Sequence, residues 1–107
     1  MKILLDESLP LKLKHDFGEE HEVTTVRDKG WLGQKNGALL KLMVDYGFQV
    51  FVTVDRNLPY QQDTKRLPII IFVLCAPNNR RDTLKALIPK MLQRLSKGDL
   101  DNVNEIS

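Results

Sequence analysis

The sequence predicts one α/β domain, built on a central, mostly parallel sheet of four or five strands. Short apolar runs rich in β-branched residues alternate along the chain with amphipathic helical stretches. The run at residues 69–74 is apolar at every position, as expected of a strand that helices cover on both faces. The 107 residues suffice for one hydrophobic core, so we expect a single domain over residues 1–107.

The composition excludes several classes of protein. Hydrophobic residues make up 42% and charged residues 28%, which is typical of a soluble globular domain. Asp6 ends the first apolar run too early for a signal peptide, and no stretch approaches the roughly 18 apolar residues of a membrane span. Cys75 is the single cysteine, so no disulfide framework or thiolate metal cluster is expected. We therefore predict a cytoplasmic protein without membrane contact.

The first third of the chain predicts two strands and a short helix. Residues 2–5 form an apolar run suited to a buried strand. Ser8 can cap a helix that has Pro10 in its first turn, and Gly18 is a natural stop. Residues 21–26 are rich in β-branched side chains and predict the second strand.

The middle of the chain predicts a helix between strands. Asn36 is a good N-cap for a helix whose apolar residues recur every three or four positions until Gly47. Residues 48–54 then predict the third strand, and residues 69–74 the fourth. Strands and helices thus alternate, which indicates right-handed crossovers and a parallel sheet.

The last third predicts a long amphipathic helix that follows residues 78–83. Pro89 interrupts its apolar pattern and should kink the helix or divide it into two. Gly98 ends it, and residues 103–106 are compatible with an edge strand that composition alone does not decide.

Two acidic residues follow predicted strands and form the candidate site. Asp6 ends the first strand and Asp55 the third, so a 2-1-3-4 strand order places them side by side at the carboxyl edge of the sheet. Grouped carboxylates bind Mg²⁺ or Mn²⁺, which can promote phosphodiester hydrolysis. The structural alternative is that Asp6 caps the first helix, Glu7 is a solvated carboxylate, and Asp55 caps whatever follows the third strand.

Basic residues near these acids are candidates for binding a phosphate backbone. Arg56 follows Asp55, and the pair Arg80 and Arg81 comes just after the fourth strand on the same predicted edge. Surface charge is the alternative for all three. Trp31 could stack on a base, or be buried at the sheet edge or at a subunit contact.

Three separated stretches resemble a known family. Residues 4–10, 26–33 and 52–58 read LLDESLP, VRDKGWLG and VTVDRNL, and in this order they resemble the DUF5615 group of PIN-like proteins. The resemblance implies a compact three-layer α/β/α sandwich that binds Mg²⁺ or Mn²⁺ through clustered acids and cleaves RNA. It also implies the toxin half of a toxin-antitoxin pair, a small antitoxin protein as partner, and a homodimer. Asp6 and Asp55 match the family's metal-binding, catalytic acids.

The chain departs from this pattern at five positions. Ser8 stands where the family usually has asparagine, and Asn36 where it commonly has aspartate, while Ala38 supplies no acid nearby. Asn57 and Leu58 replace the usual aspartate and phenylalanine after the second acid. Neutral residues supply no charge, so cation affinity should fall.

The positions at the strand ends and the family resemblance together give the candidate residues. The metal ligands are Asp6 and Asp55, with Glu7 and Asn36 as further candidates; Asp28 and Asp63 are acids that could compensate, although Asp28 also suits a turn. The substrate-binding residues are Arg56, Asn57, Arg80 and Arg81.

Three hypotheses about function follow. The first is a metal-dependent ribonuclease toxin. The second is a catalytically degenerate PIN-like module that binds RNA or protein. The third is a receiver-like phosphoacceptor domain with Asp6, Glu7 and Asp55 as its acids, although Cys75 stands where a hydroxyl residue is expected after the fourth strand and no late strand ends in lysine.

Overall fold

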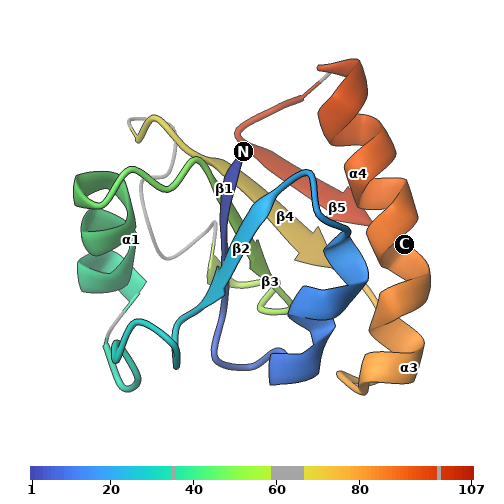
Figure 1. Cartoon of the computed structure of the whole chain (residues 1–107), viewed down its shortest axis with the longest axis horizontal. Coiled ribbons are helices and arrows are strands. Elements are labelled where there is room, and N and C mark those ends of the chain that lie inside the picture. Colours follow the sequence, from blue (N-terminus) through green and yellow to red (C-terminus); the bar gives the residue numbers. More distant parts are fainter. Residues whose placement is uncertain (35, 59–66, 99) are drawn as a thin grey trace.

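Five parallel strands form one sheet in the order β2-β1-β3-β4-β5 (Figure 1). The computed structural model describes residues 1–34, 36–58, 67–98 and 100–107. The strands are β1 (Lys2–Leu5), β2 (Glu22–Thr25), β3 (Val50–Thr53), β4 (Ile70–Leu74) and β5 (Val103–Ile106). The predicted α/β class is confirmed, and the first four strands have the 2-1-3-4 order on which the pairing of Asp6 with Asp55 depended. The C-terminal segment, left open by the sequence, is a strand at the edge beside β4.

Helices cover both faces of the sheet. The elements are η1 (Leu11–Phe17), α1 (Asn36–Asp45), α3 (Arg81–Leu84), η3 (Lys85–Leu87) and α4 (Ile88–Lys97), where η marks a 3₁₀ helix. In Figure 1, α1 lies on one side of the sheet, and α3 and α4 lie on the other. Within the described ranges, no helix is long and apolar enough to cross a membrane.

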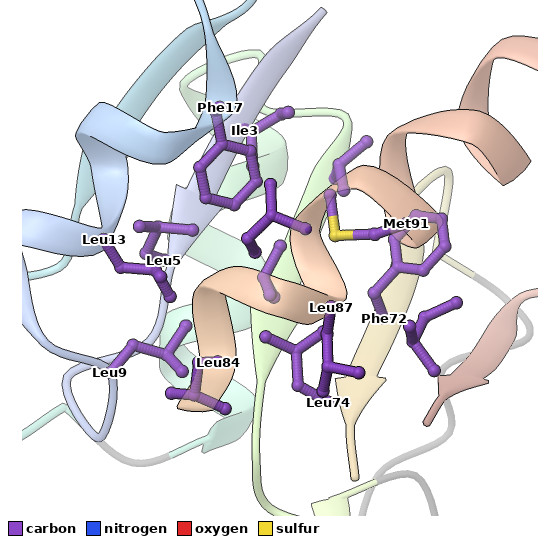
Figure 2. Close-up of a cluster of buried hydrophobic side chains, with 14 of the residues drawn as sticks. Ile3, Leu5, Leu9, Leu13, Phe17, Phe72, Leu74, Leu84, Leu87 and Met91 are labelled. Atoms are coloured by element: carbon purple, nitrogen blue, oxygen red, sulfur yellow. The ribbon is translucent and has the colours of Figure 1, made fainter. Parts of the chain in front are cut away.

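Alternation along the strands divides the core into two clusters. On β1, Ile3 and Leu5 face η1, α3 and α4, while Leu4 faces α1, because successive strand residues point to opposite faces. Figure 2 shows the first cluster, in which Phe17 from η1 and Met91 from α4 pack over the sheet. Burial on both faces explains why the inner strands are almost entirely apolar.

The first helix is short and ends before Gly18, as predicted, but its start differs. It is a 3₁₀ helix, and Pro10, not Ser8, holds its N-cap position, where no side chain caps the helix. The Ser8 hydroxyl instead donates a hydrogen bond to the Asp6 carboxylate. Asp6 does not cap this helix either, since it lies four residues before Pro10. The preference of serine for helix caps was therefore overridden by a local side-chain hydrogen bond, two residues back along the chain.

The predicted break near Pro89 is confirmed. The chain forms α3, a 3₁₀ turn and then α4, with Pro89 in the first turn of α4, where its missing N–H costs no helical hydrogen bond. Gly98 ends α4 at φ 73°, a left-handed conformation that favours glycine, and its N–H donates to the Arg94 carbonyl.

Candidate functional site

The two predicted acids lie at adjacent strand ends. β1 and β3 pair in parallel with Leu5 opposite Val52. The Asp6 N–H continues this pairing by donating to the Val52 carbonyl at 2.9 Å. Asp55 lies two residues beyond the end of β3, so the carboxyl edge of the sheet holds both acids.

A buried threonine connects the two acidic residues. The Thr53 hydroxyl donates to Asp6 Oδ2 at 2.7 Å and accepts a hydrogen bond from the Asp55 backbone N–H at 3.0 Å. Thr53 is 0% exposed, so its hydroxyl has no contact with solvent. One hydroxyl therefore fixes the Asp6 carboxylate relative to the backbone that carries Asp55.

The Asp6 carboxylate accepts hydrogen bonds from three donors in the described part of the chain. The Glu7 N–H donates to Oδ1 at 2.8 Å, and the Ser8 hydroxyl donates to Oδ2 at 3.0 Å, beside the bond from Thr53. An ionised carboxylate offers about four lone-pair sites. These donors use two sites on Oδ2 and one on Oδ1, which leaves room for monodentate cation binding through Oδ1.

Asp55 begins a tight turn that the core anchors. Its Oδ1 accepts the Asn57 N–H at 2.9 Å, and its carbonyl accepts the Leu58 N–H at 3.4 Å. Leu58 is 1% exposed and packs in the cluster beneath α1. Asp55 thus stabilises a local turn, as the structural alternative expected, while its carboxylate stays only half-buried. Arg56 and the Asn57 side chain are exposed beside it.

The two arginines after β4 have different surroundings. Arg81 forms a bidentate pair with Asp16, with Nε and Nη2 at 3.0 and 3.1 Å from the carboxylate oxygens. This hydrogen-bonded pair raises the pKa of Arg81 above its ordinary value and ties α3 to η1. Arg80 is exposed, in a turn whose Asn79 amide donates to the Ser8 carbonyl at 3.1 Å. Arg80 therefore lies on a turn held to Ser8, two residues after Asp6, whereas Asp16 of η1 holds Arg81.

Asp28 makes the contacts of a turn residue. Its carboxylate accepts from the Thr25 N–H, and its own N–H donates to the Thr25 hydroxyl. The hydrogen bond from Lys14 at 3.1 Å lowers the pKa of Asp28 below its ordinary value. These contacts favour the turn interpretation over metal binding.

The remaining candidate ligands contribute little to the described site. Glu7 is exposed, and the hydrogen bond it makes to Asp6 uses its backbone. Asn36 begins α1, but its side chain lies outside what the structure describes, and so does Asp63.

No group of three or more His, Cys, Asp or Glu side chains in the described ranges could hold a metal ion. A cation at Asp6 and Asp55 would therefore need further oxygen ligands from water, the backbone, amide side chains or a phosphate. Mg²⁺ is suited to such a site because it keeps several waters and often takes only one or two protein carboxylates.

Sequence reasoning missed Thr53 as a site residue. The available signal was a hydroxyl residue at the end of an apolar strand, two positions before Asp55 and hence on the same side of the strand. Its partner across the sheet, Asp6, followed only from the strand order.

A separate cavity lies at the opposite edge of the sheet. Met1, which precedes β1, is part of its lining, with Phe17, Glu19, Glu20, His21 and Leu92 among the others. None of the candidate site residues lines this cavity, so the cavity is separate from the acidic site.

Comparisons with protein-family models, with curated proteins and with solved structures find no match to this chain.

Proposed function

We propose that this protein is a PIN-like, metal-dependent ribonuclease with a three-layer α/β/α fold, and that it is the toxin component of a toxin-antitoxin system. The observation that carries the nuclease proposal is the Thr53 hydroxyl, which joins Asp6 to the Asp55 backbone at one sheet edge. The toxin assignment rests on the family resemblance alone.

The donor set fits a hard divalent cation. Asp6 has a free lone-pair position on Oδ1 among its described contacts, and Asp55 presents a half-buried carboxylate at the neighbouring strand end. Mg²⁺ or Mn²⁺ would lower the pKa of a bound water and stabilise charge on a phosphoryl oxygen. Asp6 and Asp55 would hold this ion.

The other residues have supporting roles in this proposal. Thr53 and Ser8 orient the Asp6 carboxylate through the bonds to Oδ2. Arg80 and Arg56 are exposed near the acids and would bind the phosphate backbone, which carries negative charge on both sides of the scissile bond. Arg81 would act on this site only indirectly, because Asp16 holds its guanidinium.

The test is cleavage of a labelled single-stranded RNA in Mg²⁺, in Mn²⁺ and in a chelator. Wild type should cleave only with metal, and Asp6→Asn and Asp55→Asn should each lose more than the ~10–100-fold that losing an outer-shell partner costs. Asp82→Asn is the matched control, because Asp82 is a highly exposed acid on α3 paired with Lys85. Equal cleavage by wild type and Asp55→Asn, or none by either, removes the catalytic proposal.

The second candidate is a PIN-like module that binds RNA or a protein without cleaving it. The specific observation in its favour is that the described acids do not form a cluster of three, and Asn57 adds no charge beside Asp55. Calorimetric titration with Mn²⁺ separates the two functions. The nuclease should give a saturable site that Asp6→Asn abolishes, whereas the binding module should give none.

The receiver alternative has less support. The order 2-1-3-4-5 is shared by flavodoxin-like folds and receivers, so topology does not distinguish it. However, Cys75 follows β4, and Ser107 rather than lysine follows β5.

A further inference from the structure

Three aromatic rings gather beside the first residue of β1. Trp31 meets Tyr46 and Phe48 in edge-to-face contacts, with ring centroids 5.1 and 6.0 Å apart. Phe48 is 3% exposed and anchors the group in the core, whereas Tyr46 is 52% exposed. The group therefore presents an aromatic ring to solvent on a rigid base.

Two lysine ammonium groups lie against these rings. Lys29 Nζ is 4.8 Å from the Tyr46 centroid and 5.3 Å from that of Trp31. Lys2 Nζ is 4.6 Å from the Phe48 centroid and donates to the Tyr46 carbonyl at 2.6 Å. Both cations are thus held in place, so a ligand that pairs with them loses little additional side-chain entropy. We call Lys2, Lys29, Trp31 and Tyr46 the aromatic-lysine surface.

The charge around this surface favours an anionic ligand. Asp28, one residue before Lys29, is paired with Lys14 at 3.1 Å, which offsets its charge. Two further acids are exposed: Asp45 precedes Tyr46 in the chain, and Glu22 lies opposite Lys2 in the pairing of β1 with β2. Among the described residues, neither forms an ion pair with Lys2 or Lys29. A purely apolar partner would have to strip water from two ammonium groups without compensating them. A ligand with a flat ring and a nearby phosphate can stack on the exposed aromatic ring and pair with the ammonium groups.

We propose that the aromatic-lysine surface binds single-stranded RNA, with one base stacked on the face of Tyr46 opposite Lys29 and the flanking phosphates paired with Lys29 and Lys2. Base stacking on aromatic side chains combined with a positively charged path is the usual mode of single-strand binding. Duplex RNA is excluded from this mode because its bases are already stacked on one another. That the ligand is RNA rather than DNA rests on the proposed function.

The position of the surface suits a substrate that also reaches the acids. Lys2 begins β1 and Asp6 follows its end, so the four residues of the strand separate the two places by roughly 13 Å at about 3.3 Å per residue. Because β1 lies inside the sheet, between β2 and β3, an RNA strand that contacts both places would pass around the β2 edge of the domain rather than along β1. The surface would then hold RNA at a distance from the bond that is cut.

The test measures binding of a fluorescent oligouridylate in the Asp55→Asn background, so that cleavage plays no part. Adding Tyr46→Ala should weaken binding about ten-fold, within the range for loss of one stacked base. Tyr46→Phe should keep the affinity within about two-fold. Lys29→Gln should reduce the slope of log affinity against log salt by about 0.7, the value for one phosphate contact on a single strand. Lys12→Gln, an exposed lysine on η1, is the matched control and should change neither quantity.

Two outcomes would overturn the proposal. One is unchanged affinity and salt slope in both Tyr46→Ala and Lys29→Gln. The other is a change of sedimentation from dimer to monomer in Tyr46→Ala with RNA binding intact, since the surface would then be a subunit contact. Loss of binding in these variants supports the surface even when wild type does not cleave RNA, so this proposal and the nuclease proposal fail separately.

Discussion

Replacing Thr53 with valine tests the connection between the two acids. Valine keeps the branched shape of threonine but removes the hydroxyl that donates to Asp6 and accepts from the Asp55 N–H. A hydrogen bond to a charged group contributes about 1.5–3 kcal/mol, and a neutral one about 0.5–1.5 kcal/mol. Asp6 is only half-buried and keeps the bonds from Ser8 and Glu7, so water can replace part of the loss. We expect Thr53→Val to lower the free energy of unfolding by about 2 kcal/mol.

Urea denaturation measures this change, and Thr53→Ser is the matched variant. Serine keeps the hydroxyl and loses one buried methyl group, which costs about 0.8 kcal/mol. Cleavage of RNA should fall about 10–100-fold in Thr53→Val and much less in Thr53→Ser, because Thr53 acts on the site through Asp6. In an Asp6→Ala background, Thr53→Val should cost at least about 1 kcal/mol less than in wild type.

Two results would refute this reasoning. The first is additivity of Thr53→Val and Asp6→Ala within about 0.5 kcal/mol, the margin seen for independent sites. The second is equal stability and equal cleavage in Thr53→Val and Thr53→Ser.

Three further predictions concern other parts of the chain. Lys14→Gln should raise the pKa of Asp28 toward its ordinary 3.8, measured by NMR titration. Because the pKa of Asp28 is lowered in the fold, its pairing with Lys14 stabilises the protein above pH 3.8. This stabilisation is lost as the pH falls through the lowered pKa. An unchanged pKa of Asp28 in Lys14→Gln would contradict this prediction. Arg80→Gln should weaken RNA binding at unchanged thermal stability, whereas Arg81→Gln should lower the melting temperature; the reverse pattern in paired melting and binding assays would show the assignment to be wrong. Gly98→Ala should cost about 1 kcal/mol in urea denaturation because alanine is strained at φ 73°, although its Cβ would meet no atom within 4 Å; unchanged stability would argue against the left-handed helix end.

Much of the fold could be predicted from the sequence because local and tertiary preferences agree there. Residues 69–74 are apolar throughout and form β4 almost as predicted. Pro89 divides the last helix because its ring and missing N–H are tolerated only in a first turn. The alternation of elements indicated a parallel sheet, and the doubly wound order assumed for it, which the structure shows, placed Asp6 beside the end of β3.

The rest depended on particular side-chain contacts, most of which join distant parts of the chain. The Ser8 hydroxyl makes a local contact that its cap preference did not indicate, since it donates to Asp6 two residues earlier. Arg81 is adjacent to Arg80 in sequence, but only the packing of η1 against α3 brings Asp16 to it. Residues 103–106 are too short and too polar to identify as a strand, and pairing with β4 determines their conformation. Thr53 and Asp6 are 47 positions apart in the chain, and a hydrogen bond between side chains so far apart leaves no periodic pattern in the sequence.

The most direct test of the central claim is a crystal structure of the protein soaked in Mn²⁺, with anomalous diffraction used to locate the ion. We predict a peak within about 2.5 Å of carboxylate oxygens from both Asp6 and Asp55, with Asp6 binding through Oδ1. The same soak of Asp6→Asn should lose the peak. A fully occupied ion elsewhere, or no ion beside these two carboxylates at a concentration that supports RNA cleavage, would contradict the assignment of Asp6 and Asp55 as the metal ligands.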